Sequence, residues 1–269
     1  MYDIWVAIII GIVEGLTEFL PVSSTGHMIL TEKLLNIDES DPMMNTFIIV
    51  IQLGAILAVV LIYWKRILSL FGIFTRTPEV KQVKRLNLLH ILIGITPAMA
   101  LAFIFRDWID LLFLPETVLI GLIVGGILLI VAEQVKEPAR AKDLDEITYK
   151  QALFIGLWQI VSLWPGFSRS GSTIAGGMLS GVNRGASADF TFIMAIPIMF
   201  AATAYSLLKS YKDFTADDIS FFVVGFVVSF LVAFVAVVSF IRFVQKVKLT
   251  YFAYYRFALA IAFAIYLWV

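Results

Sequence analysis

Long apolar runs dominate this sequence and limit what it can fold into. Hydrophobic residue types fill 61% of the 269 positions, charged residues fill 15%, and the mean hydropathy is +0.95. Soluble domains average about 45–50% apolar and about 25% charged residues. The runs have the length of about 17–25 residues that a helix needs to cross a bilayer core. The sequence therefore predicts an all-α polytopic membrane protein rather than a soluble domain or a β-barrel.

Charge and cysteine content exclude several classes of function and site. The 20 basic residues balance the 20 acidic ones and are spread through the predicted loops, so nothing indicates nucleic-acid binding. The absence of cysteine excludes disulfides and cysteine-ligated metal sites. The first apolar run contains Asp3, Glu14 and Glu18 and lacks a basic start, unlike a removable signal peptide. We therefore expect this run to stay in the mature membrane protein.

Two of the apolar segments are interrupted. Pro21 divides residues 3–36 into halves that are both too short to span a bilayer. Broken helices are tolerated at membrane depth only where protein or a wet cavity surrounds the break, so we expect a re-entrant first hairpin. Residues 150–182 repeat this pattern around Trp164-Pro165-Gly166 and form the second hairpin. Full spans are expected at about 43–64, 86–105, 117–134, 187–208, 219–241 and 250–268.

An offset of 145 residues aligns the two halves of the chain. It pairs Gly11 with Gly156, Glu14 with Gln159, Ser23 with Ser168, Thr25 with Ser170, Gly26 with Gly171 and Phe47 with Phe192. We interpret this as an internal repeat, about 1–134 and about 150–269, within a single membrane domain, 1–269. One hairpin plus three spans ends on the side opposite its start, so the second repeat is expected to be inverted. The two hairpins would then enter from opposite faces and meet near the midplane, as in inverted-repeat transporters.

The distribution of basic residues predicts the orientation. Loops 65–85, 135–150, 183–186 and 242–250 share one side and hold 14 lysines and arginines, against Lys33, Arg106, Lys209 and Lys212 on the other. By the positive-inside rule, the side with 14 basic residues is cytoplasmic. The first hairpin is therefore expected to open to the outside.

Glu14 and Glu18 lie one turn apart on the first half-helix, so their carboxylates share a face. Two like charges in a low-dielectric site cannot both ionise cheaply. They are expected either to bind a divalent cation or to hold a shared proton. The structural alternative is that one of them pairs with a buried arginine.

A hydroxyl cluster follows the break in the first hairpin. Ser23, Ser24, Thr25 and Gly26 stand where the second half-helix starts, and a helix N-terminus with added hydroxyls is a site for an anion. The alternative is an ordinary N-cap. His27 follows three residues after Ser24 and can carry a proton near neutral pH. His90, by contrast, has no polar cluster around it and is expected to be structural.

Arg169 is the strongest signal in the second hairpin, because a guanidinium at membrane depth needs an anionic partner and its fork suits phosphate oxygens. The structural alternative is a permanent salt bridge between Arg169 and Glu18. Gln159 could orient a ligand or only join two helices. Hydroxyls and glycines that allow close approach surround the arginine: Ser168, Ser170, Ser172, Thr173, Gly166 and Gly171.

Together the two hairpins offer carboxylates, hydroxyls, a histidine and an arginine in an apolar setting. Phosphoryl transfer needs charge neutralisation, positioning and a proton carrier, which these groups can supply together with a divalent metal. The apolar surroundings indicate that the phosphate belongs to a lipid.

At these two stretches the sequence resembles the bacterial undecaprenyl-pyrophosphate phosphatase family, also called the bacitracin-resistance BacA/UppP family. Glu14 and Glu18 match its Glu/Gln-x-x-x-Glu motif. Residues 23–27 match its Ser-Ser-Thr-Gly-His turn, and residues 165–173 match its Pro-Gly-x-Ser-Arg-Ser-x-x-Thr motif. Length and hydropathy fit over nearly the whole chain.

The resemblance implies hydrolysis of undecaprenyl diphosphate, which recycles the carrier lipid of cell-wall synthesis. It also implies a divalent cation and a site on the periplasmic or outer face of the bacterial plasma membrane. We expect Mg²⁺ or Ca²⁺ to bridge Glu14, Glu18 and the diphosphate, with Ser24 as nucleophile and His27 as its general acid/base. Arg169, Ser168, Ser170 and Thr173 would hold the terminal phosphoryl group.

Three alternatives stay open from the sequence. In a rival mechanism, His27 or Glu18 activates water directly and Ser24 only binds phosphate. In a rival function, the protein moves undecaprenyl phosphate across the membrane, instead of or besides hydrolysing the diphosphate. A purely structural membrane scaffold is the third alternative. The role of Arg256 and the oligomeric state do not follow from the sequence.

Overall fold

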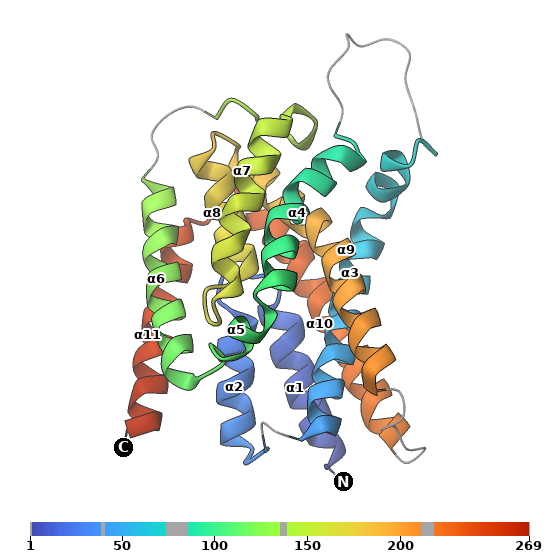
Figure 1. Ribbon diagram of the computed structural model, residues 1–269, viewed down its shortest axis with the longest axis vertical. Coiled ribbons are helices and arrows are strands. Elements are labelled where there is room, and N and C mark those ends of the chain that lie inside the picture. Colours follow the sequence, from blue (N-terminus) through green and yellow to red (C-terminus); the bar gives the residue numbers. More distant parts are fainter. Residues whose placement is uncertain (1, 39–40, 74–85, 135–138, 211–217, 269) are drawn as a thin grey trace.

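The chain forms a bundle of helices in the computed structural model, which describes residues 2–38, 41–73, 86–134, 139–210 and 218–268 (Figure 1). All regular elements of the described residues are helical, apart from an isolated bridge between Ala141 and Val182. The α-helices are α1 (Ile4–Thr17), α2 (Ser24–Leu34), α3 (Pro42–Leu70), α4 (Leu88–Ile104), α5 (Arg106–Asp110), α6 (Pro115–Glu133), α7 (Tyr149–Ile160), α8 (Arg169–Leu179), α9 (Arg184–Ser210), α10 (Ile219–Phe243) and α11 (Leu249–Trp268).

The all-α prediction is confirmed for the described residues, and their long apolar helices are compatible with a multi-pass membrane protein. Helices α3, α6, α9, α10 and α11 are long and apolar enough to cross a membrane. The predicted span at about 86–105 is the shorter helix α4, which has 17 residues and contains Pro97. At 1.5 Å per residue it is about 25 Å long, at the lower limit for a span. Of the basic residues that predict the orientation, Arg76, Lys81, Lys84, Arg85, Lys136 and Lys212 lie outside the described residues.

The first hairpin breaks where the sequence predicts. Helix α1 ends at Thr17 and α2 starts at Ser24, with Pro21 in the turn between them. Ser23 caps α2 in a left-handed conformation (φ 73°), and its hydroxyl accepts a hydrogen bond from the amide of Gly26 at 3.3 Å. The two helices have 14 and 11 residues, so neither reaches across a bilayer alone.

The second hairpin breaks in the same way. Helix α7 ends in a 3-10 turn, Val161–Leu163, and Gly166 (φ 83°) reverses the chain. Ser168 then caps α8 with φ 74°, and its hydroxyl accepts from the amide of Gly171 at 3.1 Å. Figure 1 shows α1–α2 opening toward one end of the molecule and α7–α8 toward the other, so that the turns of the two hairpins meet in the middle.

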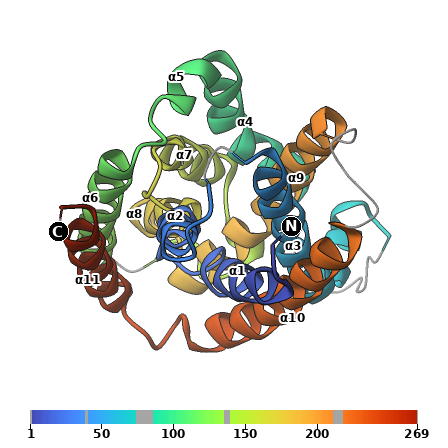
Figure 2. The ribbon, with the colours of Figure 1, turned by 90° about the horizontal axis from the view of Figure 1, so that it is seen from below.

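The hairpins sit inside a wall of longer helices. Seen along the bundle, α2 and α8 lie at the centre, while α3, α6, α9, α10 and α11 surround them (Figure 2). Helix α1 packs on α10, and α4 packs on α7. Gly15 allows the first of these approaches, because a Cβ atom there would stand 2.6 Å from the carbonyl oxygen of Ser229. The close packing fixes the depth and direction of α1, which carries Glu14 and precedes Glu18.

Candidate active site

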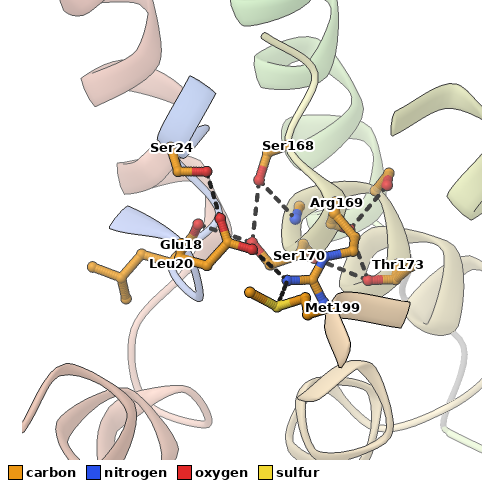
Figure 3. A network of polar contacts seen from close by, with 10 residues as sticks. Glu18, Leu20, Ser24, Ser168, Arg169, Ser170, Thr173 and Met199 are labelled. Carbon is orange, nitrogen blue, oxygen red and sulfur yellow. Dashed lines mark hydrogen bonds and ion pairs between the residues drawn. The ribbon is translucent and has the colours of Figure 1, made fainter. Parts of the chain in front are cut away.

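An ion pair joins the turns of the two hairpins. Arg169 Nη2 lies 2.6 Å from Glu18 Oε1, and the Ser24 hydroxyl donates to Glu18 Oε2, also at 2.6 Å (Figure 3). The salt bridge that the sequence leaves open as a structural alternative is therefore present. Glu18 takes one donor from each hairpin, so the carboxylate connects the hydroxyl cluster of α2 to the guanidinium of α8.

The hydroxyls of the second hairpin mostly bind main-chain carbonyls. Ser170 donates to the carbonyl oxygen of Leu20 at 2.8 Å, which is a second link between the hairpins (Figure 3). Thr173 donates to the carbonyl oxygen of Arg169 at 2.8 Å. Ser168 Oγ lies 3.1 Å from Ser170 Oγ. Because the Ser170 hydroxyl already donates its hydrogen to the carbonyl oxygen of Leu20, Ser168 is the donor in the bond between the two serines.

A polar cavity of about 190 Å³ lies between the hairpins. Water occupies about 30 Å³ per molecule, so the space holds a group the size of several waters. The predicted site residues on its wall are Glu18, Ser23, Ser24, Thr25, Gly166, Ser168 and Arg169. The N-termini of α2 and α8 both start at this wall. Their amide groups and helix dipoles favour negative charge there, so the cavity is suited to an anion.

Glu14 lies behind the cavity rather than on its wall. Its side chain is 0% exposed, and neither carboxylate oxygen has a hydrogen-bond partner among the described residues. A buried carboxylate without a partner is costly unless it holds a proton or a cation. The described residues contain no group of three or more His, Cys, Asp or Glu that could hold a metal alone. Two carboxylates are a ligand set that would suit a divalent cation only together with substrate phosphates, as is usual for Mg²⁺.

Among the described residues, the His27 ring is hydrogen-bonded to groups other than the Ser24 hydroxyl. Its Nδ1 donates to the carbonyl oxygen of Ser23 at 2.7 Å, and its Nε2 lies 2.7 Å from the hydroxyl of Tyr255. The ring stacks on Tyr255 with a centroid distance of 5.6 Å. The sequence predicts His27 as the base next to Ser24, but in this structure the Ser24 hydroxyl donates to Glu18 instead. Gln159, buried on α7, is also absent from the residues that line the cavity.

Sequence reasoning missed several residues around the site. Gln52 of α3 lines the cavity, and it is one of two side-chain amides, with Asn45, within the apolar run 43–64. A polar side chain in an apolar run is a signal of the same kind as Glu14. Trp164, Phe113 and Ser162 also line it. Aromatic and serine side chains are too common in membrane helices to be selected from a sequence.

Arg256 has a structural position beside the second hairpin. It is 0% exposed and donates to four carbonyl oxygens, those of Gly121, Leu122, Gly166 and Phe167, at 2.8–3.1 Å. It thereby ties the turn before α8 to α6. His90 is structural as predicted, because it completes the N-terminal cap of α4 with Asn87.

A comparison with known protein families identifies a family that matches most of the chain. The family model described as bacitracin resistance protein BacA matches residues 7–262 of the chain. The matched range contains the turns of both hairpins and every residue that lines the polar cavity.

Proposed function

The chain belongs to the bacitracin resistance protein BacA family, and from this premise we propose that it hydrolyses undecaprenyl diphosphate to undecaprenyl phosphate and inorganic phosphate. The observation that carries the proposal is the cavity where two helix N-termini, Arg169 and the Ser24–Glu18 pair meet. An anion site with a hydroxyl hydrogen-bonded to a carboxylate is the equipment of phosphoryl transfer.

An apolar groove beside the cavity supports a lipid substrate. It has a volume of about 590 Å³, and α4, α5, α6 and the end of α7 form its walls. Leu163 and Trp164 line both the groove and the polar cavity. An amphiphile could therefore place its phosphates among the hydroxyls and the start of its chain in the groove. A soluble phosphate ester has no apolar chain that could occupy the groove.

The proposed chemistry begins with an exchange of partners at Arg169. The terminal phosphoryl group binds at the N-termini of α2 and α8, and Arg169 moves its hydrogen bond from Glu18 to a phosphate oxygen. Glu18 then accepts the hydrogen of Ser24 as Ser24 Oγ attacks phosphorus, and the bond to the bridging oxygen breaks. Undecaprenyl phosphate leaves, and water cleaves the phosphoserine to release inorganic phosphate.

The metal, the hydroxyl groups and His27 have supporting roles in this proposal. Mg²⁺ or Ca²⁺ held by Glu14 and Glu18 would neutralise charge on the diphosphate. Ser23, Thr25 and Ser168 bind phosphate oxygens from the cavity wall, whereas Ser170 and Thr173 keep the turn of α8 in place. Glu18, which already accepts from Ser24, replaces His27 as the proposed first proton acceptor, and His27 positions the start of α2.

We also propose that the chain is one inverted-repeat domain in the bacterial plasma membrane, with its site open to the outer face. The matching caps support this, because Ser23 and Ser168 are 145 residues apart and share the same left-handed conformation. Helices α2 and α8 each have 11 residues. The Lys/Arg distribution supports the orientation.

Hydrolysis is tested against lipid transport with purified protein in detergent, where no second compartment exists. We expect wild-type protein to release phosphate from undecaprenyl diphosphate, EDTA to reduce the rate to background, and added Mg²⁺ or Ca²⁺ to restore it. The measurement is phosphate release over time. Absence of release at every metal concentration would contradict the phosphatase and favour the transporter.

The groove is tested through substrate chain length. Val124 lies on the groove wall, so the larger side chain of Val124→Trp should displace about two methylene groups of the lipid chain from the groove. The lost burial should raise KM for undecaprenyl diphosphate about tenfold. KM for inorganic pyrophosphate, which has no chain to place in the groove, should change little. Val131→Trp is the matched control, because Val131 is similarly exposed on α6 but lies outside the groove. Equal effects of the two variants on both substrates would contradict the role of the groove.

A further inference from the structure

A second cavity lies at the open end of the second hairpin, away from the active site. It has a volume of about 620 Å³ and is formed where α7 begins and α8 ends. Lys150, Phe154 and Trp158 line it from successive turns of α7. Because residues four apart share a helix face, this wall changes from cationic to apolar from the end of the molecule inward. The cavity is therefore amphipathic in the direction of the bundle axis.

Positive charge prevails at the mouth of this cavity. Arg140 joins Lys150 on the wall, and neither forms an ion pair with another described residue. Lys150 Nζ lies 5.9 Å from the ring centroid of Phe154. One carboxylate, Glu146, also lines the cavity, and its Oε2 accepts from the amide of Lys142 at 2.7 Å. Two cations thus stand against one carboxylate that is already hydrogen-bonded.

The backbone holds this cationic mouth in a fixed place. The amide of Arg140 donates to the carbonyl oxygen of Gly181 at 2.8 Å, and the amide of Asn183 donates to that of Ala141 at 2.8 Å. Gln151 Nε2 donates to the carbonyl oxygen of Ser180 at 3.3 Å, which ties the start of α7 to the end of α8. An ordered site loses less entropy on binding a ligand than a loose one.

We propose that this cavity binds an anionic phospholipid, with the phosphate between Arg140 and Lys150 and an acyl chain along Phe154 and Trp158. The charged mouth selects for an anion, and the apolar inner wall selects for a chain attached to it. The position fits a membrane lipid because the open end of a re-entrant hairpin lies at the level of the headgroups. This site is separate from the phosphatase cavity and goes beyond the proposed hydrolysis.

The test titrates delipidated full-length protein with dioleoyl phosphatidylglycerol and counts bound lipid by native mass spectrometry. Arg140→Gln/Lys150→Gln is expected to bind it about 30-fold more weakly than wild type. Arg242→Gln/Lys246→Gln is the matched control. This control also removes two positive charges. They lie at the same end of the bundle, because the neighbouring loop 244–247 is hydrogen-bonded to Arg184, which follows α8. Neither Arg242 nor Lys246 lines the cavity. The control should keep wild-type affinity.

Further arms separate a lipid from a soluble anion. Phe154→Ser should weaken phosphatidylglycerol binding. Dioleoyl phosphatidylcholine should bind equally weakly to wild type and to the Arg140→Gln/Lys150→Gln variant. Phosphate release from undecaprenyl diphosphate shows whether each variant is folded. If the double variant does not fold, the single variants Arg140→Gln and Lys150→Gln should each weaken phosphatidylglycerol binding about fivefold. Equal phosphatidylglycerol affinity in both double variants, equal binding of the two lipids, or no effect of Phe154→Ser overturns the proposal.

Discussion

Arg169→Ala is expected to lower kcat/KM for undecaprenyl diphosphate by about 10³-fold, because an arginine that neutralises a transferring phosphoryl group contributes on that scale. The guanidinium lies 2.6 Å from Glu18 and lines the polar cavity from the start of α8. Its loss removes the main cation of the cavity and leaves Glu18 with Ser24 as its remaining hydrogen-bond donor. Arg169→Lys should recover part of the activity, since it keeps the charge without the fork. The measurement is phosphate release at saturating metal.

The purely structural reading of the same ion pair makes a different prediction. If Arg169 only stabilises the contact between the hairpins, Arg169→Ala lowers the melting temperature while the folded fraction keeps near wild-type activity. The double variant Glu18→Leu/Arg169→Leu separates the two readings further, because replacing both partners by apolar groups can restore stability. A stable but inactive double variant supports a catalytic role for the ion pair, while Arg169→Ala alone reports on the guanidinium. An active one contradicts it.

Local signals explain why both hairpins could be predicted from the sequence. A proline next to glycine or to a serine-rich stretch breaks a helix here, whereas the isolated Pro97 does not interrupt α4, and a serine before a run of helix-forming residues starts a helix. The turns at Pro21 and Gly166 and the starts of α2 and α8 follow from these rules alone. The short helix α5 after α4 did not follow, because the apolar pattern of 86–105 continues almost to its start.

The arrangement within the site depends on contacts between distant parts of the chain. The spacing of Ser24 and His27 predicts a shared pocket, but Tyr255 is 228 residues away in sequence and holds the imidazole on another side of α2. The spacing of Glu14 and Glu18 predicts a shared face, yet only Glu18 reaches the cavity wall. Residue types were thus predictable from the cost of charge in an apolar setting, whereas the rotation of each helix about its axis was not.

Ser24→Ala is expected to reduce kcat roughly 10⁶-fold if Ser24 is the nucleophile, as for a serine hydrolase that loses its nucleophile. If Ser24 only binds phosphate, the loss of one hydrogen bond predicts about a tenfold effect. Ser162→Ala is the matched control. Ser162 also lines the cavity, but its hydroxyl donates to the carbonyl oxygen of Gln159 at 2.6 Å and has no carboxylate partner. Its removal should change kcat by less than about threefold.

The two mechanisms also differ in whether a covalent phosphoserine forms. In a single turnover in H₂¹⁸O, both routes place ¹⁸O in free phosphate, but only the covalent route passes through a phosphorylated Ser24 that rapid acid quenching can trap. Glu18→Gln should slow the formation of this species, because Glu18 Oε2 accepts the hydrogen of Ser24 at 2.6 Å. It should slow phosphate release equally. Labelled phosphate formed at the full single-turnover rate without any phosphoserine would instead assign the attack to water, with Glu18 as its base and Ser24 as a ligand of the phosphate.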